Sequence, residues 1–414
     1  VHKGIVNNIS QTIQSIKAAV AEAENSSGVP ISKVTVGIAG KHIRSLQHSD
    51  YIMRDHPDQY ITEEDIEKLK DQVKKLVMLP GEEIIHVLPQ EYKVDSEGEI
   101  QEPIGMHGKR LEANFHVVVG QMGSIRNIAR CVREAGLEME ALTLEPLASS
   151  ESVLTKEEKE AGVAIVDIGG GTTDIAIFKD NIIRHTCVIP YGGGIITDDI
   201  KEGCSIIEKH AEQLKVKFGS AVPELEKDTT FVTIPGLHGR PDKEISLKTL
   251  AQVVNARVEE ILEMVNTELK AYGAFEQKKK LIAGIVLTGG GSNLRNLRQL
   301  ANYTTGFDSR IGFANEYVAN DKNQFLKGPE FATSIGLLME SLKIRDKKSY
   351  PEAIENVEEK IEMVTPEAAP ETIDTPQFRT HEGENEELER KKPSKLTIGQ
   401  KIMESVKKFF EEVE

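Results

Sequence analysis

The sequence has no tryptophan, only three cysteines, and no apolar stretch long enough to cross a bilayer. A membrane-spanning helix needs about 20 apolar residues, whereas the longest apolar runs, at 163–168 and 281–287, are short and lead into glycines. Such runs are typical of buried strands. The odd number and scattered spacing of the cysteines predict a reducing cytoplasm and no structural metal. Lysine or arginine runs with interleaved aromatics are also lacking, so nucleic acid is not an expected partner.

Negative charge is concentrated toward the C-terminus. The 414 residues carry a formal net charge of -16, and residues 351–389 alone hold 13 acidic and 2 basic residues. This Glu/Pro-rich composition without periodicity predicts an acidic disordered linker over 342–394. The remaining chain is only mildly acidic and too long for one compact core, so two or more lobes are expected.

Apolar periodicity predicts the elements of the first half. A helix is expected from Ile9 to Glu24, followed by a strand over Val34–Gly40. The elements expected next are helix Thr62–Val77, strands Glu83–Val87 and Leu111–Val119, and helix Ser124–Ala135. This order suggests a small α+β module set into a larger domain.

The second half begins with three short apolar strands joined by tight turns, an antiparallel meander. These strands are Val163–Asp167, Asp174–Phe178 and Ile182–Ile189, and a further buried strand is Ile282–Leu287. The expected helices are Ile195–Glu202, Ser205–Phe218, Ser246–Tyr272, Asn293–Tyr303 and Phe331–Ile344.

A phosphate-binding loop is predicted at Asp167–Asp174, where a β-branched strand runs into three glycines and two threonines. Glycines let backbone N–H groups approach a phosphate closely, and the two flanking aspartates are suited to a hydrated divalent cation. A glycine-rich hairpin with solvated aspartates is the alternative. A second strand with a glycine loop, Ile285–Gly291, favours the functional interpretation, because two facing loops make a nucleotide cleft.

The chain resembles the FtsA family of bacterial cell-division proteins, membrane-tethered homologues of actin. The resemblance is carried by GKHI (40–43), HVLPQEY (86–92), LASS (147–150), VDIGGGTTDIAIF (166–178), RHTCVIPYGGGIITDDI (184–200), GIVLTGGGSNLRNL (284–297), RIGFAN (310–315) and SIGLL (334–338). It implies an α/β, actin-like two-lobed ATPase fold in which an unrelated α+β subdomain replaces a small subdomain of actin.

The domain layout implied by the resemblance follows the predicted elements. It places a part of the first lobe at 1–40, the inserted α+β subdomain at 41–138, a return to the first lobe at 139–162, the second lobe at 163–190 and 283–341, and its outer subdomain at 191–282. The family's first phosphate motif, an Asp-x-Gly-Thr hairpin, should precede the Ile9 helix and is not in this sequence. We therefore expect the sequence to be truncated at its N-terminus.

The resemblance also assigns a binding site for ATP and Mg²⁺. The residues that match the second phosphate motif are Asp167, Gly169, Gly170, Gly171 and Thr172, with Asp167 holding Mg²⁺ through water. Those that match the adenosine motif are Thr288, Gly289, Gly290 and Gly291.

Three further residues match the superfamily, and each has a second interpretation. Glu212 and Lys215 match positions that reach the ribose and base, but are equally placed for a solvated ion pair three residues apart on a helix. Glu145 matches the position that orients the attacking water, and is also a plain residue at the start of a helix before Pro146.

An amphipathic helix is predicted at 395–414. Its apolar residues fall on one helical face, with lysines and glutamates on the rest; they are Ile398, Ile402, Val406, Phe409, Phe410 and Val413. Such a helix beyond a linker is suited to lie in a membrane surface, or else to dock on a protein, and the resemblance favours an anionic membrane.

The function implied is a divisome protein at the cytoplasmic face of the inner membrane, at the septum. It would bind ATP, act at most as a weak ATPase, polymerise with itself, contact other divisome proteins and anchor the FtsZ ring. By resemblance, the FtsZ-binding face lies in about 191–282. The alternatives are a sugar or acid kinase and a chaperone-type ATPase of the same superfamily, although Glu145 is the one candidate base found in the sequence.

Overall fold

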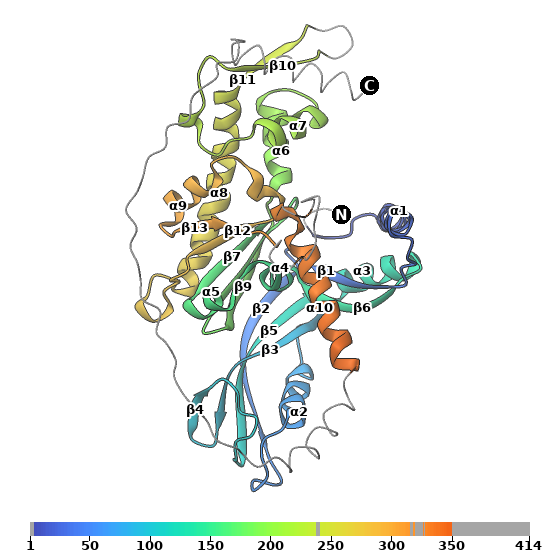
Figure 1. The fold of residues 1–414 in the computed structure, drawn as a ribbon, viewed down its shortest axis with the longest axis vertical. Coiled ribbons are helices and arrows are strands. Elements are labelled where there is room, and N and C mark those ends of the chain that lie inside the picture. The colour runs from blue at the N-terminus through green and yellow to red at the C-terminus, as the bar shows by residue number, and fades with distance from the viewer. Residues whose placement is uncertain (1–3, 237–240, 315–317, 319–325, 327, 350–414) are drawn as a thin grey trace, which may run out of the picture. The chain divides into compact units, whose positions relative to one another are not determined.

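The computed structural model describes residues 4–236, 241–314, 318, 326 and 328–349, whose helices and strands are drawn in Figure 1. The predicted membrane helix at 395–414 and most of the predicted linker lie outside the described residues. None of the helices within the described ranges is long and apolar enough to cross a membrane.

The first sheet consists of two parallel strands, β1 (Lys33–Ile38) and β6 (Glu138–Leu144). Helix α1 (Ile9–Ser27) begins where the Asn8 side chain accepts the Gln11 N–H, and ends at Gly28 with φ 70°. Both are favourable helix ends, since an Asx residue satisfies a free N–H and glycine adopts a left-handed conformation without strain. Helix α3 (Met122–Glu134) packs against α1 and β6. It therefore lies with the first sheet, although the predicted inserted module extended to residue 138.

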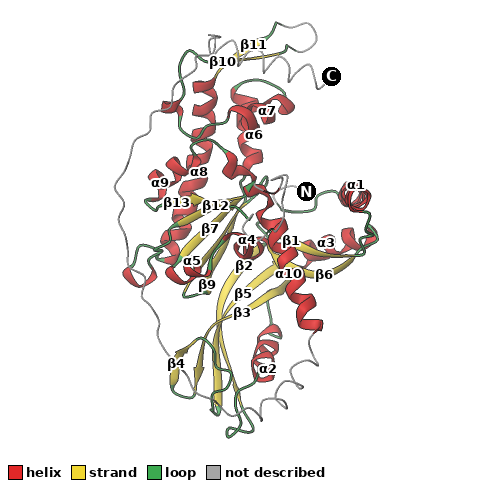
Figure 2. Ribbon diagram, viewed as in Figure 1, coloured by secondary structure: helices red, strands yellow, loops and turns green. Residues whose placement is uncertain are grey.

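A second, four-stranded antiparallel sheet has the order β2-β5-β3-β4. Its strands are β2 (Ile43–Met53), β3 (Glu82–Val94), β4 (Glu97–Ile100) and β5 (Arg110–Gln121). One face packs against helix α2 (Glu63–Lys74), as Figure 2 shows, and Leu69, Val73, Phe115 and Val117 are fully buried between them. This module thus has a hydrophobic core of its own.

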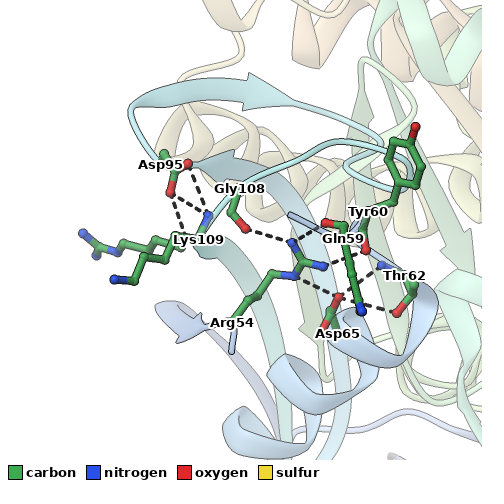
Figure 3. A network of polar contacts seen from close by, with 9 residues as sticks. Arg54, Gln59, Tyr60, Thr62, Asp65, Asp95, Gly108 and Lys109 are labelled. Atoms are coloured by element: carbon green, nitrogen blue, oxygen red, sulfur yellow. Dashed lines mark hydrogen bonds and ion pairs between the residues drawn. The ribbon is translucent and has the colours of Figure 1, made fainter. Parts of the chain in front are cut away.

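A buried arginine holds the connection from β2 to α2. The Arg54 guanidinium donates to the carbonyl oxygens of Gln59, Tyr60 and Gly108 and, through Nε, to Asp65 at 3.0 Å (Figure 3). A buried charge is costly unless it is paired and fully hydrogen-bonded. Here four acceptors meet that need, so the loop is fixed by the same bonds.

Strand β2 was not expected from the sequence. Its half-buried positions include Ser45, His48 and Asp50 as well as Leu46 and Ile52, so the apolar alternation that marks a half-buried strand is weak. The segment forms a strand because it pairs with β5 along its whole length.

The third sheet is central to the candidate site and has the order β13-β12-β7-β8-β9. Its strands are β7 (Val163–Ile168), β8 (Thr173–Lys179), β9 (Ile182–Ile189), β12 (Ile285–Thr288) and β13 (Ser309–Ile311). β13, β12 and β7 are parallel, whereas β7, β8 and β9 form the predicted antiparallel meander. Helices α4 (Glu145–Val153) and α5 (Lys156–Ala161) pack on its strands.

The remaining helices are α6 (Gly193–Gly203), α7 (Glu208–Phe218), α8 (Leu247–Tyr272), α9 (Leu297–Thr305) and α10 (Ala332–Ser349), and a hairpin consists of β10 (Phe231–Ile234) and β11 (Lys243–Ser246). Several boundaries differ from the sequence-based expectation: β3 extends to Val94 and not Val87, α7 starts at Glu208 and not Ser205, and β12 starts at Ile285 and not Ile282. Two further differences concern α9 and α10. Residues 290–293 form a 3-10 turn and α9 starts only at Leu297, since Asn296 has a left-handed φ of 63°. Helix α10 continues past Leu342, the predicted start of the linker, to Ser349.

The inserted sheet is held on the edge strand β9 by polar contacts. Gln90 donates to the Ile183 carbonyl at 2.5 Å, and Arg184 pairs with Glu91 at 2.6 Å. His116 Nε2 lies 2.9 Å from Thr186 Oγ1. The HVLPQEY and RHTC motifs therefore face each other, which the sequence did not predict.

Candidate nucleotide-binding site

The glycine loop between β7 and β8 has backbone groups facing two directions. Gly169 N–H donates to the Thr172 carbonyl within the loop. The carbonyls of Gly169 and Gly170 accept the N–H groups of Gly193 and Gly194 at 2.8 and 2.7 Å. The N–H groups of Gly170 and Gly171 have no acceptor among the described residues. They are the donors that a phosphate at this loop would engage.

Close packing explains why glycines follow β9. A Cβ on Gly192 would lie 2.5 Å from the Gly169 carbonyl oxygen, and one on Gly194 would lie 3.0 Å from that of Gly170. Thr173 Oγ1 also donates to the Tyr191 carbonyl at 2.8 Å. The start of α6 is thus bonded directly to the phosphate loop.

Asp167 lies at the end of β7 and is buried. Its Oδ2 accepts hydrogen bonds from Ser149 Oγ on α4 at 2.6 Å and from Thr333 Oγ1 on α10 at 3.0 Å. Burial raises the pKa of Asp167, while the two hydroxyl donors act in the opposite direction. Helices from distant parts of the chain therefore converge on this carboxylate.

Asp174 and Glu145 complete a group of three acidic side chains. Burial and, to a smaller extent, the charges of Glu145 and Asp167 raise the pKa of Asp174 well above its usual range. Burial and the Asp167 charge raise the pKa of Glu145 to about 7. Thr172 Oγ1 donates to Asp174 Oδ2 at 2.7 Å, but Asp174 Oδ1 is buried without a hydrogen-bond partner in the part of the chain that the structure describes.

Glu145 is the first residue of α4, with Pro146 after it in the first turn, so it does start a helix. The preceding N–H, that of Leu144, donates to Nε2 of His86 at 3.0 Å. Burial lowers the pKa of His86 to about 4, so the imidazole is neutral and able to accept this bond. A side chain of the inserted sheet thus helps to hold the start of α4.

A cavity of about 350 Å³ joins the segments that sequence analysis singled out. The predicted site residues that line it are Gly169, Gly170, Glu212, Lys215, Gly290 and Gly291. Ile196, Val216 and Leu294 supply an apolar part of the wall. Gly171 lines an adjoining cavity of about 560 Å³ together with Gly170 and Glu212. The two glycine loops therefore do face one space, as expected.

Glu212 and Lys215 of α7 form an ion pair of 2.7 Å, but the pair is not simply solvated. Lys215 Nζ also donates to the Gly193 carbonyl at 2.9 Å and to Thr197 Oγ1 at 2.8 Å, and only 13% of its side chain is exposed. The ammonium group is therefore fixed at the start of α6, beside the phosphate loop.

The adenosine-motif loop divides into buried and cavity-lining residues. Thr288 is fully buried, and its hydroxyl lies 3.2 Å from the carbonyls of Gly312 and Pro329. Gly289 has a φ of 80°, and a Cβ there would lie 2.2 Å from Asp167 Oδ1. Ser292, expected near a helix start, instead donates to the Thr288 carbonyl at 2.6 Å. Of the four matched residues, Gly290 and Gly291 face the cavity.

Several residues of the site were not predicted. Ser149 lies within LASS and Thr333 directly before SIGLL, so the motifs were noticed but not the role of these hydroxyls. Asn293 and Glu330 line the cavity, and Asn293 Nδ2 donates to Glu330 Oε2 at 2.8 Å. Glu330 has no local pattern around it that marks a binding residue.

Comparisons with known proteins agree with this geometry. Residues 164–336 match the family model "Cell division protein FtsA", and residues 40–119 match the model "SHS2 domain inserted in FTSA". The cell division protein FtsA of Pseudomonas aeruginosa is 40% identical over 341 residues, which are 82% of this chain and 80% of that protein. FtsA of Escherichia coli K12 is 35% identical over 340 residues, with 81% and 80% covered.

Among solved structures, the PilM-PilN type IV pilus biogenesis complex is similar with a TM-score of 0.58. The sequence identity is 17%, and the match covers 82% of this chain and 87% of the other. At that identity the likeness concerns the fold alone. The predicted actin-like α/β fold is confirmed.

Proposed function

Because this chain belongs to the FtsA family of cell division proteins, we propose that it binds ATP, polymerises, and anchors FtsZ to the cytoplasmic membrane at the septum. The observation that carries the ATP part is the 350 Å³ cavity between the two glycine loops and α7. Its size and mixed apolar and polar wall suit a small ligand. The open N–H groups of Gly170 and Gly171 provide a place for phosphates.

In the proposed arrangement the phosphates lie at the Gly169–Gly171 loop and the ribose lies near Glu212. Lys215 is fixed by three oxygen partners beside that loop, which places a positive charge close to the phosphates. The apolar side chains of Val216 and Leu294 are then available to the base.

The acidic group fits Mg²⁺ held through water. Asp174 has a buried oxygen without a partner among the described residues. Repulsion from Glu145 and Asp167 helps to raise the pKa of Asp174, and repulsion from Asp167 that of Glu145, so a nearby cation would be favourable. No set of three acidic, histidine or cysteine ligands with direct-binding geometry occurs among the described residues. Asp167 and Asp174 would orient the water ligands, and the ion would offset phosphate charge.

We assign the weak ATPase activity of the proposal to Glu145. Since burial and Asp167 raise its pKa to about 7, roughly half of the molecules carry the charged form near neutral pH. It can then orient a water or accept its proton, as the family resemblance implies. ATP hydrolysis at Glu145 would need only water as the second reactant. A kinase would need a separate pocket for its phosphate-accepting substrate.

The membrane part of the proposal rests on the sequence. Six apolar residues on one face of the segment 395–414 would bind lipid weakly and reversibly. Head-to-tail stacking of subunits makes an open filament, in which many such segments bind together and gain avidity. The acidic stretch at 351–389 would be repelled by anionic lipid and hold the folded part away from the surface.

The proposed domain ranges are those expected from the resemblance, except that helix α3 is assigned to the first lobe and helix α10 extends beyond residue 342. The FtsZ-binding face is proposed in about 191–282. A kinase or chaperone role has no observation in its favour here. A phosphoacceptor-dependent turnover above about 1 per second would favour the kinase class.

Titration of the full chain with ATP and Mg²⁺ tests the nucleotide part. We expect saturable binding that ADP competes for, and the absence of binding by the full chain would contradict the proposal.

Flotation with anionic liposomes tests the anchor. The full chain should float and carry purified FtsZ with it, whereas a variant ending at residue 394 should leave both in the pellet fraction. Equal flotation of the two forms would remove residues 395–414 from the proposal. FtsZ left behind by a floating full chain would remove the FtsZ part.

A further inference from the structure

One carboxylate in the cavity wall, that of Glu330, has no role in the proposed binding of phosphates, ribose or Mg²⁺. Glu330 belongs to a short 3-10 turn, Pro329–Phe331, and lines the cavity together with residues of α7. Its Oε2 accepts the Asn293 side-chain N–H at 2.8 Å. Its Oε1 has no hydrogen-bond partner among the described residues, and the side chain is exposed toward the open cavity.

The turn that carries Glu330 is fixed to the adenosine-motif loop. The Pro329 carbonyl accepts the Gly289 N–H at 3.1 Å and lies 3.2 Å from Thr288 Oγ1. A Cβ on Gly290 would lie 3.8 Å from the Cβ of Glu330. Glu330 therefore has a defined place beside the glycine loop.

Charge decides which part of a nucleotide this carboxylate can face. A carboxylate beside a polyphosphate would be repelled, and the phosphates already have the Gly170 and Gly171 N–H groups and Lys215. Glu212, the other acidic residue of the wall, is engaged by Lys215 and Thr197. The base is the part of the ligand left for Glu330.

An ionised carboxylate is a hydrogen-bond acceptor only, so it selects a base edge that presents an N–H donor. Adenine presents its exocyclic N6 amino group as that donor. We propose that Glu330, positioned by Asn293, accepts a hydrogen bond from the 6-amino group of the bound adenine and so contributes to base selection. This inference rests on the proposed ATP function and assigns a specificity role within the same cavity.

Two ligands that differ only in the 6-amino group of the purine test whether Glu330 accepts a hydrogen bond from it. ATP and purine riboside 5′-triphosphate share ribose and phosphates, but the second has hydrogen in place of the 6-amino group. Both are titrated into the full chain with Mg²⁺, into Glu330→Ala, and into Glu263→Ala, whose exposed carboxylate on α8 does not line the cavity.

The wild type and Glu263→Ala should prefer ATP by about tenfold, the size expected for one hydrogen bond to a charged group. In Glu330→Ala the preference should fall to about twofold or less, with purine riboside triphosphate bound as before. Glu330→Gln, which keeps an acceptor oxygen without the charge, should lie between them.

An unchanged preference in Glu330→Ala would overturn the inference. Equal weakening of both ligands would also overturn it, because Glu330 would then only shape the loop. In either case ATP binding itself would stand. A wild-type chain that binds neither triphosphate would instead remove the proposed function, and this inference with it.

Discussion

Ser149 Oγ donates a hydrogen bond of 2.6 Å to Oδ2 of Asp167, and this bond joins α4 to the start of the phosphate loop. Both side chains are buried. Thr333 Oγ1 lies 3.0 Å from the same serine hydroxyl and donates to the same oxygen. Helix α4, helix α10 and strand β7 are thus joined at the Asp167 carboxylate. A substitution at any of these contacts should alter the position of the phosphate loop.

Ser149→Ala should destabilise the fold by about 1.5–3 kcal/mol, since it removes a hydrogen bond to a buried charged group. Ser150→Ala is the matched control, because Ser150 is equally buried and donates only to the Leu147 carbonyl within α4. Urea unfolding of the full chain measures both. A loss in Ser149→Ala no larger than that in Ser150→Ala would mean that the bond to Asp167 contributes little.

Glu145→Gln should change how stability depends on pH. The folded-state pKa of Glu145 is raised to about 7 from a usual 4.5, so the folded protein holds a proton that the unfolded chain releases between these values. The contribution of Glu145 to stability should therefore be lost as pH rises from 4.5 to 7, and the difference between wild type and variant isolates it. At pH 8 the variant should be more stable by about 2–3 kcal/mol, and at pH 4.5 the two should be equal.

The measurement for Glu145→Gln is urea unfolding at pH 4.5 and pH 8, with Glu263→Gln as an exposed control. A stability difference that does not vary with pH would show that Glu145 titrates normally in the folded protein.

Lys215→Ala should weaken ATP binding by about tenfold or more, since the ammonium group lies beside the phosphate loop and bonds to charged ligands are worth about 1.5–3 kcal/mol. Lys209→Ala, an exposed change on the same helix, should bind as the wild type does. Equal affinities of the two variants, measured by titration, would exclude Lys215 from the phosphate site.

His116 should make the folded protein sensitive to mild acid. Burial, and to a smaller extent His185, lower its pKa to about 4 from 6.5, so the unfolded chain binds a proton that the folded protein does not. The contribution of His116 to stability should therefore be lost as pH decreases from 6.5 to 4, by about 3 kcal/mol for this fully buried group. His86, whose pKa is also about 4, adds a second loss of the same sign.

His116→Gln should remove the His116 share of this loss, so the stability of the variant relative to the wild type should rise from pH 7 to pH 5, and urea unfolding at the two pH values measures the difference. An identical pH dependence in the wild type and in His116→Gln would show that the imidazole is not held neutral against β9.

Local patterns in the sequence determined the meander β7-β8-β9, both glycine loops and the helices α1, α2 and α8, because apolar periodicity and turn residues act over a few positions. Strand β2 was not predicted, because its core-facing positions are partly polar and only pairing with β5 makes this segment a strand. The short β10-β11 hairpin and β13 were also not expected from the sequence, since strands of three or four residues show little periodicity.

The sequence by itself determined the family resemblance and the identity of the loops that line the cavity. Only the tertiary structure decided that Ser149 and Thr333, 184 residues apart, meet on Asp167, and that Glu330 and Lys215 line the same cavity. It also decided that Thr288 and Gly289 are packing residues while Gly290 and Gly291 face the cavity. Sequence motifs reflect the local conformation that the backbone must adopt, such as a tight turn at a glycine loop. Burial, interactions between charges and the hydrogen-bond partners of a side chain depend instead on contacts between segments that lie far apart along the chain.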